Sequence, residues 1–152
     1  MRAFIFRLET LLNLRKLERD EALSQYAKAI SERKTSENML SNAESKGFSI
    51  QELLRQKQKG SFSADEVFML QSSYEKNLEI IKQRKADLSS KLTSEENFKK
   101  LFIDKDTALK SISRLREVKN EEHLQNERKK EDLELEDIIN SRFSYLHNHQ
   151  VF

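Results

Sequence analysis

KGFSIQE (residues 46–52) and KGSFSADE (residues 59–66) decide the fold, because they contain the only two glycines of a sequence without proline. Glycine suits the position just past the end of a helix, where the backbone is often left-handed. In both stretches a lysine precedes the glycine, and the helix dipole favours a cation there. Each stretch therefore predicts the end of a helix.

Both stretches also carry the signals of a helix that begins. The spacing of a capping box occurs twice, in Ser49 with Glu52 and in Ser63 with Glu66. The spacing of a hydrophobic staple also occurs twice, in Phe48 with Leu53 and in Phe62 with Val67. We therefore expect helices over about residues 4–46, 50–58 and 64–147. A weaker capping box at residues 93–96 leaves open a break in the third helix.

The composition favours long helices over a globular core. Charged and hydrophobic residues each make up 36% of the chain, and the mean hydropathy is −0.81. This is typical of coiled coils, and the interspersed charges, with a net charge of +2, argue against disorder. The chain has no cysteine and no basic field for nucleic acid. No apolar run reaches the roughly 20 residues that span a membrane.

Apolar residues recur at the spacing of a coiled coil. One seam of the first predicted helix contains Ile5, Leu8, Leu12, Ala22, Tyr26, Ala29, Leu40 and Ala43. Four polar positions interrupt this seam: Arg15, Arg19, Arg33 and Ser36. The third predicted helix repeats Val67, Tyr74, Ile81 and Leu88 every seven residues. The sequence thus predicts an all-α, elongated antiparallel two-helix coiled coil with a short helix in the connection, forming one domain over residues 1–152. Either the end of the third helix overhangs, or that helix breaks and the termini meet.

The residues needed for catalysis or for a cofactor are not brought together by any motif. The two glycines lie thirteen residues apart, which fits neither a P-loop nor a dinucleotide-binding turn. His147 and His149 lie on different faces of a helix, so a shared metal is not expected, and His123 is interpreted as a surface residue. We expect a protein that is not an enzyme and binds no cofactor, metal, small-molecule substrate or nucleic acid.

Three stretches resemble the flagellar export protein FliJ family. FIFRLETLLNLRKLERDEA (residues 4–22) is similar to the family's opening, in which Phe4, Phe6, Leu8, Leu11, Leu12, Arg15, Glu18 and Ala22 occupy the motif positions. ALKSISRLRE (residues 108–117) and ELEDIINSRF (residues 134–143) resemble two later family motifs. Ser141 departs from the family pattern, in which a second arginine is common at that position.

The resemblance implies a stalk protein of the flagellar type III export apparatus. Its implied partners are the hexameric flagellar export ATPase, whose assembly it would promote, the cytoplasmic domain of the export-gate membrane protein, and export chaperones that it would recycle. Its implied location is the cytoplasm, in peripheral association with the inner membrane at the flagellar base. A plain coiled-coil spacer or tether and the equivalent stalk protein of a virulence type III secretion system remain alternatives.

Two sets of residues are candidates for these contacts. For the ATPase, the apolar clusters at the paired termini supply Leu8, Leu12, Arg15, Leu135, Ile138 and Phe143. For the export gate, the resemblance implies an exposed apolar pair four residues apart early in the third helix, and its best match is Tyr74 with Leu78, with Met39 close by. Simple packing within the coiled coil is the alternative role for all of these residues.

Overall fold

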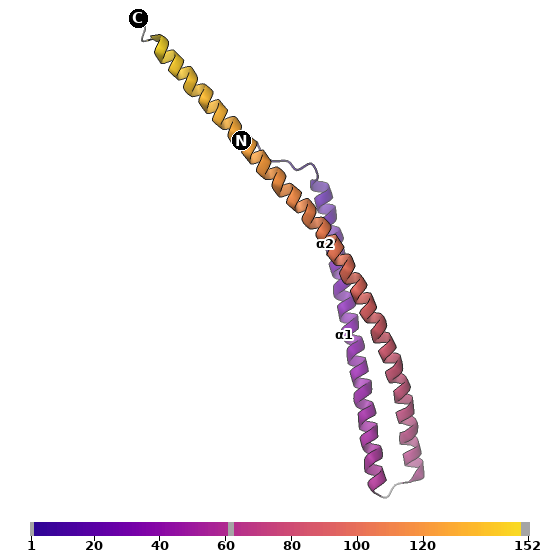
Figure 1. The fold of residues 1–152 in the computed structure, drawn as a ribbon. Helices are drawn as coiled ribbons and strands as arrows, with labels where there is room; N and C mark the ends of the chain where they lie inside the picture. Colours follow the sequence, from indigo (N-terminus) through magenta and orange to yellow (C-terminus); the bar gives the residue numbers. More distant parts are fainter. Residues whose placement is uncertain (1, 61–62, 150–152) are drawn as a thin grey trace. The chain divides into compact units, whose positions relative to one another are not determined.

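The computed structural model describes residues 2–60 and 63–149, which form two long helices (Figure 1). Helix α1 is Glu9–Lys59 and helix α2 is Ala64–His149. The described residues form no strand, and the two helices pack against each other. The predicted all-α hairpin coiled coil is therefore confirmed.

The chain divides into two compact units, and both helices contribute to each. The hairpin unit is Arg19–Lys105, which contains the turn between the helices. The terminal unit is Met1–Glu18 together with Asp106–Phe152. The candidate residues for the export gate therefore belong to the hairpin unit, and those for the ATPase belong to the terminal unit.

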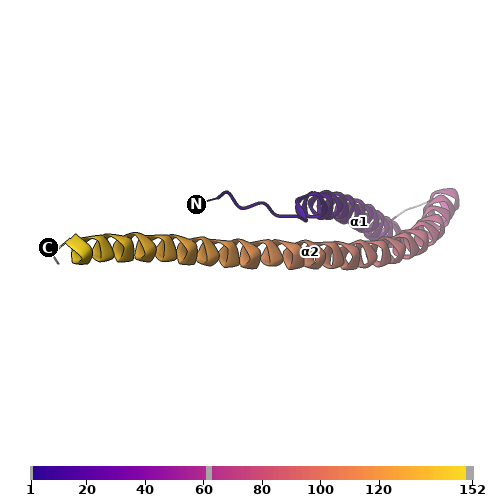
Figure 2. The same ribbon diagram turned by 90° about the horizontal axis from the view of Figure 1, so that it is seen from above.

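Antiparallel contacts hold the hairpin unit together, and Figures 1 and 2 show α1 beside α2 there. The polar contacts between the helices are Lys57–Glu66 at 3.0 Å, Gln51–Tyr74 at 2.5 Å, Ser36–Asp87 at 2.8 Å and Glu32–Lys91 at 3.2 Å. In this order of contacts, the residue numbers on α1 fall from 57 to 32 while those on α2 rise from 66 to 91, as in an antiparallel pair. The two helices therefore keep one register from Lys57 back to Glu32.

The seam of the hairpin unit has a regular spacing of three and four residues on both helices. On α1 the seam positions, all buried or half-buried, are Ala22, Tyr26, Ala29, Arg33, Ser36, Leu40, Ala43, Gly47, Ile50, Leu54 and Lys57. Arg33 and Ser36, which we expected to interrupt this seam, lie on it. Arg33 forms an ion pair with Glu95 of α2, and Ser36 donates a hydrogen bond to Asp87. Pairing across the helices lets polar side chains occupy seam positions without losing their partners.

The predicted helix end at Gly47 is wrong, because α1 continues through it. Gly47 is buried, and a Cβ there would lie 2.6 Å from Nδ2 of Asn77 on α2. That nitrogen donates a hydrogen bond to the carbonyl oxygen of Ala43 at 3.0 Å. The glycine therefore makes room for a buried amide between the helices, instead of ending a helix.

The predicted helix start after Gly47 is also wrong, since Ser49 lies inside α1. Its hydroxyl donates to the carbonyl oxygen of Ser45 at 3.0 Å, as serine often does in a helix interior. Glu52 pairs with Arg55 at 2.7 Å instead of reaching back to a cap. The predicted short helix 50–58 is thus the last part of α1, and Phe48 is exposed instead of forming a staple with Leu53.

The stretch KGSFSADE (residues 59–66) ends one helix and begins the next, as predicted. Helix α1 ends at Lys59 and α2 begins at Ala64. The Ser63 hydroxyl accepts a hydrogen bond from the backbone N–H of Glu66 at 3.2 Å, which is one half of the predicted capping box. The Glu66 carboxylate reaches Lys57 instead of returning to Ser63. The predicted staple at Phe62 falls outside the described residues.

Helix α2 runs through the possible break at residues 93–96. The hydroxyl of Thr93 donates to the carbonyl oxygen of Ser89 at 3.1 Å, so its oxygen does not cap a new helix. Of the two layouts left open by the sequence, the continuous third helix is the observed one.

The terminal unit is built from an extended N-terminal segment, the start of α1 and the second half of α2. Residues 2–8, here called the strap, are not helical, so the predicted start of the first helix near residue 4 is wrong. Its aromatic side chains pack on α2 in a small core of Phe6, Leu12 and Leu109, flanked by Phe4 and Ile112. An extended segment covers about twice the length per residue of a helix, so a short strap can reach along several turns of α2.

Candidate functional site

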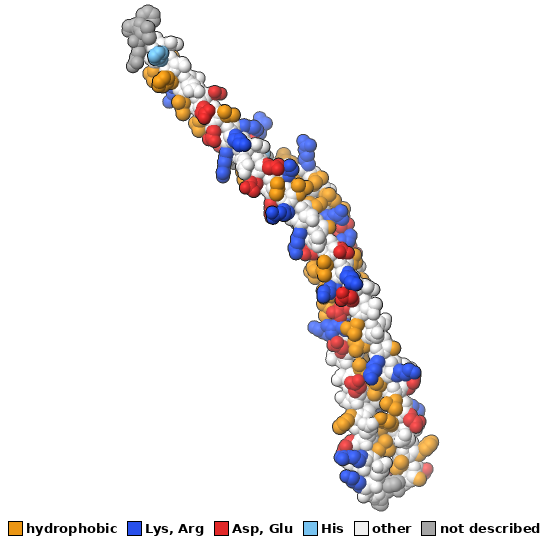
Figure 3. All heavy atoms as spheres, in the orientation of Figure 1, with side chains coloured by type: hydrophobic (Ala, Val, Ile, Leu, Met, Phe, Trp, Pro, Cys, Tyr) orange, Lys and Arg blue, Asp and Glu red, His pale blue; other side chains and the backbone are white. Residues whose placement is uncertain are grey.

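A stripe of exposed apolar side chains lies near the end of α2, in the terminal unit. The C-terminal apolar face consists of Leu135, Ile138, Ile139, Phe143, Tyr145 and Leu146. These side chains are 52–73% exposed, and Figure 3 shows hydrophobic side chains along this part of α2. Steps of three and four residues place them on one side of the helix. Isolated apolar side chains are common on surfaces, whereas a continuous stripe of this kind makes this part of α2 a candidate interaction site.

The opposite side of the same stretch is polar. It carries Glu136, Asp137, Asn140 and Ser144, which are all exposed. Three of the six residues predicted to contact the ATPase, Leu135, Ile138 and Phe143, lie together on the apolar side. The stretch is therefore an amphipathic helix whose apolar side can accept a partner.

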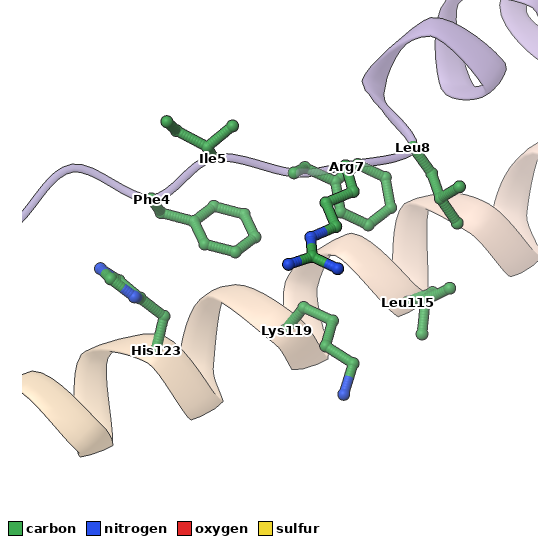
Figure 4. A pocket seen from close by; sticks show the side chains of 8 residues that line it. Phe4, Ile5, Arg7, Leu8, Leu115, Lys119 and His123 are labelled. Carbon is green, nitrogen blue, oxygen red and sulfur yellow. The ribbon is translucent and has the colours of Figure 1, made fainter.

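The strap forms a second apolar surface, a pocket of about 410 Å³ open to solvent (Figure 4). Its walls are the strap residues Phe4 to Leu8 together with Leu115, Lys119 and His123 of α2. Ile5, which we predicted on the seam of the first helix, points away from α2 and is 83% exposed. In an extended segment, neighbouring side chains point to opposite sides, so Phe4 and Phe6 pack on α2 while Ile5 does not.

Polar contacts fasten the start of the strap to α2. The carbonyl oxygen of Arg2 accepts a hydrogen bond from Nε2 of His123 at 2.8 Å, and the His123 ring lies against Phe4. The backbone N–H of Arg2 donates to the Glu127 carboxylate at 3.1 Å, and Lys130 donates to the same carboxylate at 2.9 Å. These hydrogen bonds, that from Lys130 first, lower the pKa of the Glu127 carboxyl from 4.5 to about 2. His123 is therefore part of the strap attachment and not only a surface residue.

The N-terminal candidates for the ATPase have different environments. Leu8 is 41% exposed at the edge of the strap pocket. Leu12 is only 2% exposed and packs in the core of the terminal unit. Arg15 pairs with Glu18 of the same helix at 2.9 Å. Of these three, only Leu8 presents a substantial apolar surface.

The two terminal clusters do not form one surface. Leu12 packs against Leu109, whereas Leu135 lies 26 residues further along α2, or about 39 Å at 1.5 Å per residue. The expectation that the anchors lie together at paired termini is therefore wrong. The cause is that the first helix is much shorter than the second, so α2 continues past the strap.

The candidates for the export gate are also unequal. Tyr74 is half-buried on the seam, and its hydroxyl accepts a hydrogen bond from Gln51 of α1. Leu78 and Met39 are exposed. Tyr74 therefore stabilises the helix pair, while Leu78 and Met39 are available to a partner.

Some exposed apolar side chains near the turn were not among the predicted site residues, and the most exposed are Phe48 of α1 and Phe68 and Met69 of α2. The spacing of Phe48 with Leu53 predicts a hydrophobic staple, so Phe48 was expected to be packed and not exposed. Phe68 and Met69 adjoin the seam residues Val67 and Leu70, and a strict seven-residue count would have placed them off the seam.

The described residues hold no cluster of three or more His, Asp or Glu side chains that could bind a metal ion. Within the same residues, neither helix contains a segment apolar enough to cross a membrane.

Comparisons with known proteins point to one family. A family model described as "Flagellar FliJ protein" matches residues 4–145, which is nearly the whole chain. Among curated proteins and among solved structures, none matches the chain. The matched range includes most of the strap, the turn and most of the C-terminal apolar face.

Proposed function

Since the chain belongs to the FliJ family of flagellar proteins, we propose that it promotes flagellar protein export by binding the export ATPase through its C-terminal apolar face. The family consists of non-catalytic accessory proteins associated with flagellar export. This membership favours the flagellar interpretation over the virulence stalk protein and the plain spacer that the sequence left open.

The exposure of the C-terminal apolar face is the observation that supports the proposal. Most of the stability of a helix in a protein comes from packing of its apolar side, so this exposed side of α2 gains stability when a partner covers it. Full burial of a leucine, isoleucine or phenylalanine side chain is worth about 1.5–3 kcal/mol. Leu135, Ile138 and Phe143 together can therefore anchor a protein partner.

The effect on the ATPase follows from linkage. A protein that binds the assembled hexamer more tightly than the single subunit shifts the assembly equilibrium toward the hexamer. It needs no catalytic group to do so. The rate of hydrolysis then rises because more of the ATPase is in the assembled form.

A second contact is proposed for the hairpin unit. Leu78 and Met39 are the exposed candidates for the export gate, whereas Tyr74 lies on the seam and is hydrogen-bonded to Gln51. Binding at the gate would bring the protein to the cytoplasmic side of the inner membrane as a peripheral component. Recycling of export chaperones is a further proposed role, for which we assign no residues.

The ATPase proposal is tested with Phe143→Asp and a matched control, Ser144→Asp. Both variants add one carboxylate to the same helix turn, but Ser144 lies on the polar side. We expect the wild-type chain to raise ATP hydrolysis and the hexamer population of the cognate ATPase, measured by phosphate release and light scattering. Phe143→Asp should require at least about tenfold more protein for half-maximal stimulation, because a buried carboxylate is costly.

The control should stimulate as the wild type does, and circular dichroism should show the same helix content for all three proteins. If a large excess of the wild-type chain changes neither hydrolysis nor assembly, the proposed function is wrong.

A further inference from the structure

Arg142 is the one charged residue within the C-terminal apolar face. Its neighbours three and four residues away along the helix are Ile138, Ile139, Tyr145 and Leu146. These are the positions whose side chains adjoin it on the helix surface. All four are apolar, so the guanidinium is surrounded on its own helix by side chains that cannot accept a hydrogen bond from a cation, save the Tyr145 hydroxyl.

Elsewhere on the two helices, cations pair with a carboxylate at this same spacing. Examples are Arg15–Glu18, Arg55–Glu52, Lys110–Asp106, Lys119–Glu122 and Lys130–Glu127. No ion pair or hydrogen bond of Arg142 is found among residues 2–60 and 63–149, and the side chain is exposed to solvent. Water satisfies its five N–H donors as long as the face is uncovered.

A partner that covers the face removes that water. An arginine enclosed in an interface without a carboxylate is strongly unfavourable, whereas a bidentate carboxylate partner restores its hydrogen bonds in a fixed geometry. We propose that Arg142 is the specificity-determining residue of the C-terminal apolar face and that the docking surface of the ATPase is apolar with a carboxylate placed against it. This inference rests on the proposed function.

The same charge disfavours other occupants. In an antiparallel pair of two copies of this face, both Arg142 side chains would enter the centre of one apolar interface, and like charges there are costly. The polar side of the stretch carries Glu136 and Asp137, whereas helices that lie on anionic membranes carry lysine and arginine there. Arg142 therefore selects an acidic protein surface.

The test compares Arg142→Leu, Arg142→Glu and Arg142→Lys with a control, Lys129→Glu, in the full-length chain. Lys129 lies on the same helix but off the apolar face. Binding to the assembled cognate ATPase is measured by titration at several salt concentrations, and helix content is checked for each variant. We expect Arg142→Leu and Arg142→Glu to bind at least about tenfold more weakly, since a lost partner of an interfacial charge pair usually costs that much or more.

Arg142→Lys should bind with intermediate strength, because it keeps the charge but loses the planar bidentate geometry. Arg142→Leu should also lose part of the salt dependence of binding, which a purely structural role would not change. Lys129→Glu should bind as the wild type does.

The possible failures are distinguishable. If the wild type binds the ATPase and Arg142→Leu binds equally well or better, this inference is overturned while the proposed function stands. If the wild type does not bind at all, the proposed function fails and the assigned occupant fails with it. Sedimentation with vesicles of anionic phospholipid should capture none of the proteins, and capture that depends on Arg142 would also overturn the inference.

Discussion

Gly47 and Asn77 meet where α1 and α2 of the hairpin unit enclose a polar side chain. Asn77 is 2% exposed, and its Nδ2 is held by the carbonyl oxygen of Ala43. Its Oδ1 has no hydrogen-bond partner within the described part of the chain. A buried amide of this kind lowers stability but favours one register of a coiled coil over others. Gly47 is the residue that gives this amide its space.

Gly47→Ala should therefore destabilise the protein even though alanine is the better helix former. The new Cβ would lie 2.6 Å from Nδ2 of Asn77, so the amide must move and its bond to Ala43 is lost. An unsatisfied buried group costs about 1–3 kcal/mol, and the helix gains about 1 kcal/mol from the alanine. We expect a net loss of about 1 kcal/mol in the free energy of unfolding, measured with urea.

Gly60→Ala is the matched control, because nothing lies within 4 Å of a Cβ at Gly60 and its backbone is not left-handed. It should be neutral or stabilising by up to about 1 kcal/mol. An equal loss in both variants would contradict the role assigned to Asn77.

The attachment of the strap to α2 depends on pH through the carboxyl group of Glu127. Its pKa is lowered to about 2, so its hydrogen bonds to Lys130 and to the N–H of Arg2 stabilise the terminal unit fully above about pH 4.5. They are lost as the pH falls through about 2 and the carboxyl becomes protonated. We expect the contact between the Phe4 and His123 rings, followed by nuclear Overhauser effects, to persist at pH 5 and to vanish near pH 2.

Glu127→Gln should release the strap already at neutral pH, and trypsin should then cleave faster after Arg7. The stacked rings of Tyr26 and Phe102 in the hairpin unit serve as the internal control, since their contact should survive the substitution. A strap that stays attached in Glu127→Gln would show that the aromatic packing and the hydrogen bond from His123 to Arg2 hold it without Glu127.

Within the two helices, the two glycine-containing stretches (residues 46–52 and 59–66) have different roles. The Ser63 hydroxyl caps α2, whereas that of Ser49 bonds within α1. The two stretches look alike because the local signals of a helix end are short. Whether such a signal acts depends on what the rest of the fold places against it, and at Gly47 that is Asn77 of the other helix.

Ser63→Ala should lower the free energy of unfolding by about 1 kcal/mol, the usual cost of a lost serine cap. Ser49→Ala should change it by less than about 0.5 kcal/mol, as for most substitutions of exposed residues. Urea titrations of both variants check this difference. If Ser49→Ala cost as much as Ser63→Ala, the continuity of α1 at Ser49 would be in doubt.

At the scale of the whole molecule, the proposed function needs two surfaces that act separately. The C-terminal apolar face belongs to the terminal unit, while Leu78 and Met39 belong to the hairpin unit. Each surface can be altered without touching the core of the other unit, because the substituted side chains are exposed.

Leu78→Asp should weaken binding to the cytoplasmic domain of the export gate by at least about tenfold, because it places a charge in an apolar contact. It should leave stimulation of the ATPase unchanged, and Phe143→Asp should have the reverse effect. Pull-down with the gate domain and ATPase assays on both variants measure this separation. Loss of both activities in either variant would contradict the assignment of two surfaces.

Features that depend only on neighbouring residues could be predicted from the amino-acid sequence. The helical spacing of apolar side chains predicted an all-α hairpin, the Ser63 cap and Gly60 located the reversal, and the stripe from Leu135 to Phe143 revealed an apolar helix side. Motifs of a few residues were enough to indicate the family. Each of these signals lies within a few turns of one helix, where the physics of capping and amphipathicity is local.

Features that depend on contacts between residues far apart in the sequence could not be predicted in this way. Only the packing of Asn77 against Gly47 shows that this glycine continues a helix, and only the contacts of Phe6 with Leu109 show an extended strap. The same is true of Leu12, which the sequence offered as an interface residue and the fold buries. A seam residue and an exposed residue can have the same amino-acid type and the same spacing. Whether a side chain is buried depends on which side chains of the opposite helix face it.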